Sequence, residues 1–463
     1  MSLLLKHTLF DEFQLRGTFW TPTKPENKVP GKFFWSPKDG GRLELLGQIL
    51  LSRDDRWDVL LFGEVANDAI GPLPVTLENV TRRRDGGRDD HSLFSATRCY
   101  CGAHVKLDQH LFSSTDIYLD SLAEWYGFEP WEMRGQLEQP EGEGRRKITL
   151  LDTPHIVIPV PSIGGDIQFT GIRRSSYTRK SFSITHDVLL VAQCKPRPIE
   201  DWWDFVHSQT RLITLLSCGR CHPNRVELEL RRSQAERHRL GEKVCVYFRH
   251  NRERQDYQQI GPNMPFQYPR IKEVFARVAD KWFSAYDKLH DCLRILFRQL
   301  ERPGDEIIPR FLNACQMFEA FHRITRDEPY ADPVRYSAWF KQMKSAIPVD
   351  VSEPHRNSLE NKLKYGNERA LRSRLRAAFE SLPPEVRVAI DVDPKKDANL
   401  IADTRNAHIH LNESPDKKTL TEREMVPYCS KIVMTVGYLL WCDLGLKEFV
   451  RVPRDVNELW FLT

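Results

Sequence analysis

The hydrophobic periodicity of the sequence changes near residue 270, and this change constrains the fold more than any other feature. Before it, apolar residues form short β-branched or aromatic runs between turn residues, a pattern typical of strands. After it, apolar residues such as Val274, Val278 and Trp282 recur every three or four positions, as on one face of a helix. The chain therefore predicts an α+β protein, with a β-rich N-terminal domain over residues 1–250 and an all-α C-terminal domain over residues 270–463.

The N-terminal part predicts a series of strands, one helix and several turns. Gly-rich segments at 37–41 and 85–87 mark turns, and the polar segment 138–144 should be an exposed loop. A helix should begin near Asp201 and end at Cys218-Gly219, where glycine suits a C-cap. The expected strands are residues 43–45, 57–62, 74–77, 148–151, 155–160, 187–191, 225–230 and 244–248.

The C-terminal part predicts a series of helices separated by breaker residues. Pro303-Gly304 should end the first helix, and Pro383-Pro384 should end a strongly basic segment that is either one helix or a pair. The expected helical segments are residues 271–300, 307–324, 334–347, 357–381, 396–410 and 421–444.

The composition predicts a soluble globular protein. Of the 463 residues, 40% are hydrophobic and 29% are charged, which is unlike a disordered chain. No apolar run approaches the roughly 20 residues needed to span a bilayer, and the N-terminus lacks the features of a signal peptide. We therefore expect a cytoplasmic protein whose ten cysteines are mostly free thiols.

Local charge is more informative than the formal net charge of +4, which is too small to indicate nucleic-acid binding. Between Arg356 and Arg376 there are seven Arg and Lys residues against Glu360 and Glu368. Smaller basic clusters occur at 81–84 and 231–232. Two interpretations stay open, namely a solvated helix face and a groove that follows a phosphate backbone.

The stretch Arg405-Asn406-Ala407-His408-Ile409-His410 carries the clearest chemical signal. Arginine stays charged at any working pH and can grip a phosphate with two parallel hydrogen bonds. Histidine has an ordinary pKa of about 6.5, so it can give or take a proton near neutrality. Together these groups can cleave an RNA backbone without a metal ion, although the spacing alone recurs by chance in long proteins.

Helical geometry limits how this stretch can work. Asn406 and His410 are four residues apart and share a face of a helix. Arg405 and His410 are about 140° apart, so one regular helix cannot aim both at a single phosphate. Either the helix unwinds near His410, before the breaker sequence at 412–415, or two copies of the chain share the site. A position in the last turn would favour the protonated form of His410.

Several segments together resemble one family. Residues 401–410 resemble the Arg-x4–6-His motif of HEPN ribonucleases. Other segments resemble the ApeA-type antiphage branch of that superfamily, in both halves of the chain. These are residues 16–22, 29–31 and 43–47, the Glu319-x-x-His322-Arg323 helix at 311–323, the Arg-rich segment 371–375, and residues 439–446.

The resemblance implies a helical-bundle HEPN domain at 270–463 that dimerises to form a composite ribonuclease cleft, and a sensing or regulatory domain at 1–250. It implies a metal-independent endoribonuclease in which the ribose 2′-OH attacks the adjacent phosphorus and leaves a 2′,3′-cyclic phosphate. The expected substrate is RNA, in particular tRNA, cut in response to a phage-derived activator and causing growth arrest or abortive infection. The expected partners are a second copy of the chain, or more copies in a larger homo-oligomer, and no membrane.

Within that family, three residues are the expected catalytic set. His410 would transfer protons, a role generally worth about 10²–10⁴-fold. Arg405 would stabilise charge on the phosphoryl oxygens, and Asn406 would orient His410 or bind the phosphate. His408 is a second candidate for the histidine. The alternative is a non-catalytic HEPN scaffold that binds RNA or a protein, for which the basic residues Arg369, Arg372 and Arg374 would matter most.

Other motifs give weaker signals. Cys218 and Cys221 have the spacing of a zinc finger, and Cys99 and Cys101 could supply a second pair, but free thiols are the simpler interpretation. The haem-attachment string Cys218-Gly219-Arg220-Cys221-His222 would require export. Glu319 and His322 are three residues apart on a helix, which indicates a structural hydrogen bond or a lining of the cleft. We expect no cofactor and no catalytic metal, because phosphate-binding, dinucleotide-binding, zinc-protease and serine-hydrolase motifs are all missing from the sequence.

Overall fold

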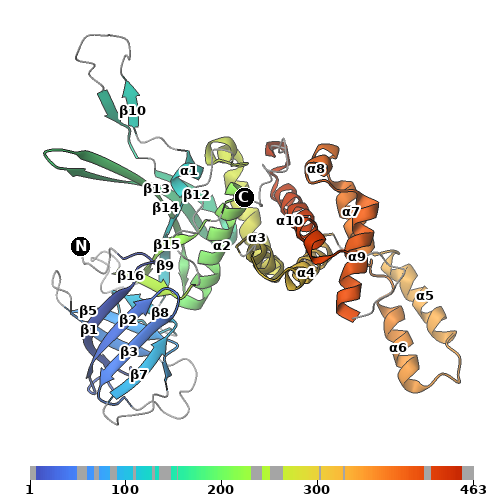
Figure 1. The fold of residues 1–463 in the computed structure, drawn as a ribbon, viewed down its shortest axis with the longest axis horizontal. Helices are drawn as coiled ribbons and strands as arrows, with labels where there is room; N and C mark the ends of the chain where they lie inside the picture. The colour runs from blue at the N-terminus through green and yellow to red at the C-terminus, as the bar shows by residue number, and fades with distance from the viewer. Residues whose placement is uncertain are drawn as a thin grey trace. The chain divides into compact units, whose positions relative to one another are not determined.

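The structure is a computed structural model. It divides into two compact units, residues 1–283 and 284–463, and the boundary falls within helix α3 (Figure 1). The described residues are 7–49, 60–66, 72–83, 91–107, 111–127, 131–134, 147–153, 155–219, 221–230, 242–250, 264–301, 304–326, 329–410 and 419–450.

The first unit is built on one large antiparallel sheet. Within the described residues its strands follow the order β12-β13-β14-β9-β15-β16-β8-β5-β4-β1-β2-β3-β7-β6, and β10 (Trp131–Arg134) pairs separately with β11 (Lys147–Leu150). The strands of the large sheet are β1 (Phe13–Trp20), β2 (Val29–Ser36), β3 (Gly40–Leu46), β4 (Leu61–Val65), β5 (Leu73–Glu78), β6 (Thr81–Arg82), β7 (His91–Ala96), β8 (Arg98–Cys101), β9 (Phe112–Leu119), β12 (His155–Val160), β13 (Gly165–Tyr177), β14 (Phe182–Arg197), β15 (Pro223–Leu230) and β16 (Glu242–Phe248).

Helices and aromatic side chains complete the core of this unit. Helix α2 (Ile199–Ser217) packs on β9, and the Trp202 indole donates a hydrogen bond to Phe112 O at 3.1 Å. The short helix α1 (Leu122–Tyr126) contributes Trp125 to an aromatic cluster with Phe169 and Phe275. Such buried aromatic groups contribute a large share of the apolar area removed from water on folding.

The second unit is helical. Helix α10 (Glu422–Leu444) packs along α4 (Ile307–Thr325), and α7 (Leu371–Ser381) packs along α9 (Pro394–His410). The remaining helices are α3 (Tyr268–Glu301), α5 (Pro333–Ser345), α6 (Glu353–Lys364), α8 (Pro384–Ala389) and the short η5 (Lys447–Phe449). Helix α10 has a clear start and stop, because Thr421 and Glu424 form a capping box and Gly445 adopts a left-handed conformation.

Helix α10 is the most apolar of the long helices that the structure describes. It is the one described helix that is long and apolar enough to cross a membrane, with a mean hydropathy of 1.3 over its best window. However, 72% of this apolar stretch is buried within the structure, as is usual for a core helix. Its apolar character therefore follows from its central position in the bundle.

The structure confirms the predicted fold class, a β-rich N-terminal part followed by helices, and differs in detail. Several strands were not predicted, namely β1, β2, β6, β7, β8, β9, β10 and β13. For β9 the reason is that its buried centre, Ser114-Thr115-Asp116, is polar. The expected strand at 57–62 lies further along the chain, as β4, and residues 51–59 are outside the described part. Helix α2 ends with Cys218, rather than Gly219, in the left-handed conformation. The basic segment is two helices, α6 and α7, and α8 was not expected.

Some predicted features fall on residues outside the described part. These are the turn at 85–87, the loop at 138–144, the basic pair at 231–232, Arg84 of the cluster at 81–84 and the breaker sequence at 412–415.

Candidate active site

Helix α9 carries the Arg-Asn-x-x-x-His motif along its C-terminal half. The Asp393 side chain accepts hydrogen bonds from the backbone N–H groups of Lys395 and Lys396, at 3.0 and 2.8 Å, and Pro394 begins the helix. An acidic cap followed by proline is a favoured helix start. The helix continues through His410, so the motif lies within regular helical structure.

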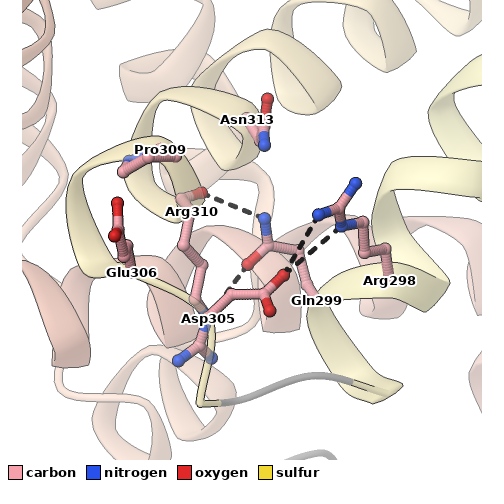
Figure 2. A pocket seen from close by; sticks show the side chains of 7 residues that line it. All are labelled: Arg298, Gln299, Asp305, Glu306, Pro309, Arg310 and Asn313. Carbon is pink, nitrogen blue, oxygen red and sulfur yellow. Dashed lines mark hydrogen bonds and ion pairs between the residues drawn. The ribbon is translucent and has the colours of Figure 1, made fainter. Parts of the chain in front are cut away.

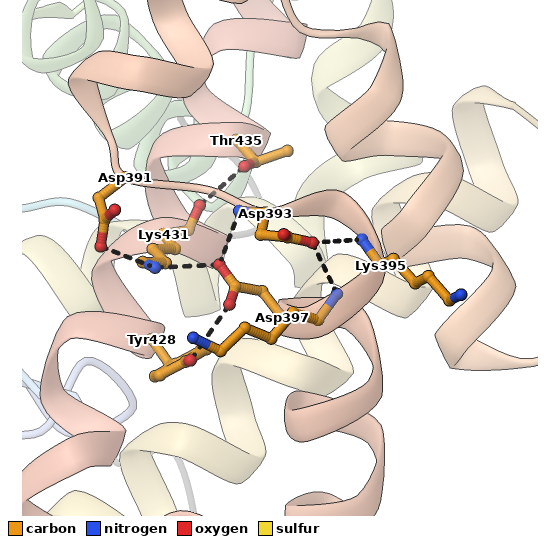
Figure 3. Close-up of polar contacts among 8 residues, drawn as sticks. Asp391, Asp393, Lys395, Asp397, Tyr428, Lys431 and Thr435 are labelled. Atoms are coloured by element: carbon orange, nitrogen blue, oxygen red, sulfur yellow. Dashed lines mark hydrogen bonds and ion pairs between the residues drawn. The ribbon is translucent and has the colours of Figure 1, made fainter.

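A buried ionic network holds the first turn of α9 against α10 (Figure 3). Lys431 donates to Asp397 at 2.9 Å and to Asp391 at 3.3 Å, and the Tyr428 hydroxyl donates to Asp397 at 3.1 Å. Asp397 and Lys431 are both buried. Burial and the neighbouring Asp397 carboxylate raise the pKa of Tyr428 above its ordinary range, so this hydroxyl remains a donor. The network therefore fixes where α9 begins.

Arg405 lies in a partly exposed ionic cluster between α9 and α4. Its guanidinium is 3.7 Å from the Glu319 carboxylate and donates to the Asn406 side-chain oxygen at 3.1 Å. Glu319 also faces Arg323 at 3.8 Å, and Arg323 pairs with Glu368 at 3.2 Å. About 31% of the Arg405 side chain is accessible, so a phosphate can reach it from solvent.

The structure does not bring Arg405 and His410 together within one chain. Because α9 is helical between them, the two side chains leave the helix about 140° apart. Asn406 and His410 are both exposed and share a face of the helix, whereas His408 is half-buried. Asn406 is therefore associated with both of the other motif residues. It accepts a hydrogen bond from Arg405, and it lies one helical turn before His410 on the same face.

Glu319 and His322 have separate partners, although the sequence suggested that they belong to one structural pair. Glu319 faces Arg405, while His322 is buried and its Nδ1 lies 3.4 Å from the Arg374 guanidinium. Arginine can only donate, so Nδ1 of His322 is the acceptor and carries no proton. The sequence could not show that α4 faces α9, which is why the contact between Glu319 and Arg405 was missed.

The basic segment before the motif is mostly engaged within the protein. Arg372 pairs with Asp403 of α9 at 2.7 Å, and Arg376 pairs with Glu380 at 2.8 Å. Arg374 is 1% exposed, and its guanidinium also donates to Arg369 O at 2.8 Å. In the scaffold alternative Arg374 would therefore act through the fold rather than by touching RNA, because this side chain is part of the core.

A polar hollow of about 260 Å³ lies where α3 meets α4 (Figure 2). Gln299 and Arg310 exchange two hydrogen bonds of 3.0 and 3.1 Å, and Arg298 pairs with Asp305 at 3.3 Å. These contacts join the end of α3 to the start of α4. None of the residues that line the hollow belongs to the motif.

The cysteines are free thiols, and the described residues hold no group of three or more His, Cys, Asp or Glu placed to bind a metal ion. The Cys99 and Cys101 sulfurs lie 3.6 Å apart within β8, and the Cys221 sulfur contacts the Ser217 hydroxyl. Burial raises the pKa of the Cys221 thiol to about 12, so the free side chain is neutral. The residues considered for zinc thus do not form a four-cysteine site.

Comparison with known families gives two matches that together cover most of the chain. Residues 14–282 match the family model of ApeA N-terminal domain 1, and residues 312–448 match that of Apea-like HEPN. This chain is an ApeA-type HEPN antiphage protein. The HEPN match contains the motif on α9 and the Glu319, His322 and Arg374 side chains described above. No curated protein and no solved structure matches the ApeA-type chain.

Proposed function

We propose that this ApeA-type protein is a metal-independent endoribonuclease that acts in the cytoplasm during phage infection. Its site would be composite, formed where the HEPN domains of two copies meet, and Arg405, Asn406 and His410 would be its catalytic residues. The substrate class is RNA, with tRNA as the specific proposal. A phage-derived activator would start cleavage, and loss of the RNA would arrest growth.

The observation that carries this proposal is the unbroken helix from Arg405 to His410. One helix cannot direct both side chains at one phosphate, because they diverge by about 140°. Two α9 helices related by a two-fold axis can do so, since Arg405 of one copy then faces His410 of the other. The helix geometry therefore supports a site that is shared between two chains.

The chemistry needs only proton transfer and charge stabilisation. A base removes the proton of the ribose 2′-OH, the oxygen attacks phosphorus, and the bond to the 5′-oxygen breaks. The leaving oxygen takes a proton, and the products are a 2′,3′-cyclic phosphate and a 5′-hydroxyl. His410 would move the protons, Arg405 would stabilise the additional negative charge on the phosphoryl oxygens, and Asn406 would hold both side chains.

One observation favours a second candidate, a non-catalytic scaffold that binds RNA or a protein. The Arg405 charge is partly neutralised by Glu319, as in an ion pair that only stabilises the fold. In a scaffold, Arg405→Ala and His410→Ala would leave function unchanged, whereas in a ribonuclease each would abolish cleavage.

The deciding experiment is a tRNA-cleavage assay with EDTA present and an extract of phage-infected cells added to supply the activator, on wild type, Arg405→Ala, His410→Ala and the matched control His408→Ala. We expect wild type and the control to release fragments with cyclic phosphate ends, and the other two variants to release none. Mixing the two inactive variants tests the composite site. A heterodimer contains one intact Arg405 and one intact His410 on opposite chains, so activity should partly return. Full activity in both single variants would refute the ribonuclease proposal.

A further inference from the structure

Helices α5 and α6 form an antiparallel hairpin whose helical residues are all at least partly exposed (Figure 1). The two helices mainly contact each other, through a hydrogen bond from the Tyr336 hydroxyl to Leu363 O and an ion pair of 2.7 Å between Lys344 and Glu360. Helices that build a globular core bury an apolar stripe. This hairpin buries none, so core formation does not explain its presence.

The base of the hairpin is firmly closed. The Asn367 side chain accepts from Ala331 N at 2.8 Å and donates to Ala331 O at 2.9 Å. The Tyr330 hydroxyl lies 2.9 Å from the Ser373 hydroxyl on α7. The hairpin therefore extends from a fixed point on the helical bundle.

That fixed point is next to the candidate active site. Glu368 at the base pairs with Arg323 of α4, Arg323 faces Glu319, and Glu319 faces Arg405, at 3.2, 3.8 and 3.7 Å. Three consecutive ionic contacts thus connect the hairpin to the arginine of the motif. Whatever the hairpin binds would be held close to Arg405.

The hairpin surface combines unpaired cations with exposed aromatic rings. Residues 333–364 contain six Lys and Arg against three acidic residues. Within the described residues, its cations Arg335, Lys341, Lys362 and Lys364 form no ion pair. Trp339 is 40% exposed with the Arg335 guanidinium 4.9 Å from its ring, and Tyr365 at the end of α6 is 58% exposed.

We propose that the α5–α6 hairpin is an RNA-binding arm that grips the substrate beside Arg405. Its free cations neutralise phosphates, and Trp339 and Tyr365 stack on unpaired bases, a combination suited to single-stranded regions and loops. A second copy of the chain is disfavoured as the occupant, because two hairpins of like charge repel each other. The inference rests on the proposed ribonuclease function and names how the substrate is held.

The test measures binding separately from cleavage. The full-length chain carrying His410→Ala is titrated with a labelled tRNA transcript at several salt concentrations. The hairpin variant adds Lys341→Glu, Lys362→Glu and Lys364→Glu. Its matched control adds Lys24→Glu, Lys32→Glu and Lys38→Glu, which make the same charge change at exposed positions of the first unit.

We expect the hairpin variant to raise Kd at least about tenfold, and to reduce the slope of log K against log salt by roughly two to three. Trp339→Ala should raise Kd by about tenfold with little change in slope, because stacking is not ionic. In the chain with His410 intact, both changes should raise KM for RNA and leave kcat unchanged.

Three outcomes would contradict the proposal that the α5–α6 hairpin binds RNA. The hairpin and control variants could bind RNA equally well, or the His410→Ala chain could bind no RNA. Light scattering could also show that the hairpin variant loses its oligomeric state while RNA affinity is unchanged, which would make the hairpin a contact between copies. The ribonuclease proposal fails separately. A wild type that binds RNA through the hairpin but cuts none when the extract of phage-infected cells is added would support the RNA-binding arm and contradict the ribonuclease proposal.

Discussion

Arg405 is the side chain on which the proposed chemistry depends most, and its surroundings indicate why lysine should not replace it. Its guanidinium already contacts Glu319 and Asn406 while part of it remains open to solvent. A planar guanidinium has enough N–H donors to bind these two groups and a phosphate at the same time, whereas the ammonium group of lysine does not. We expect Arg405→Lys to lower kcat/KM for RNA by roughly a hundredfold. The exposed Arg423→Lys is the control, and wild-type activity in Arg405→Lys would reject the assigned role.

Arg374, unlike Arg405, is a buried cation. Its hydrogen bonds go to His322 and to a backbone oxygen. Removing it would leave these acceptors unsatisfied and open a cavity between α4 and α7. Arg374→Ala should lower the free energy of unfolding by about 3 kcal/mol. Arg372→Ala, which breaks a partly exposed pair, should cost about 1 kcal/mol or less. Denaturant unfolding of both variants measures the difference, and equal losses would contradict it.

At the scale of elements, the position of α9 depends on the network that joins its first turn to α10. Lys431→Ala would leave the Asp397 carboxylate buried without its cation, so we expect a loss of about 3–5 kcal/mol. Tyr428→Phe removes one hydrogen bond and should cost about 1 kcal/mol.

The double variant Lys431→Ala with Asp397→Ala tests whether the two residues stabilise the protein together or independently. If the network is one unit, the double variant is no less stable than Lys431→Ala alone. Additive losses in thermal or denaturant unfolding would show that Lys431 and Asp397 act independently.

At the scale of the whole molecule, the composite site predicts that activity depends on assembly. If each site needs two chains, the specific activity of the ribonuclease should fall on dilution below the dissociation constant of the dimer. Cleavage assays over a concentration series, with light scattering at the same concentrations, measure this. A monomer with constant specific activity would contradict the composite site, and a species larger than a dimer would indicate further contacts between copies.

The fold class and the position of the motif could be predicted from the amino-acid sequence, because both depend on local patterns of residues. Apolar residues at helical spacing located α9 and α10 to within two residues, and residue chemistry alone singled out Arg405 and His410. The polar strand β9 and the six-residue helix α8 are among the elements that were missed, because buried polar residues and so short a helix give no periodic signal.

The contacts between residues far apart in the chain became known from the packed structure alone. The contacts of Arg405 with Glu319, of Arg374 with His322 and of Lys431 with Asp397 join residues 34 to 86 positions apart. No local pattern encodes such distances, because they depend on how helices pack. The structure likewise separated Arg374, a core residue, from the exposed cations of the α5–α6 hairpin, although all of them belong to basic stretches of the sequence. Burial decides which cations can reach a phosphate, and burial is a property of the packed fold.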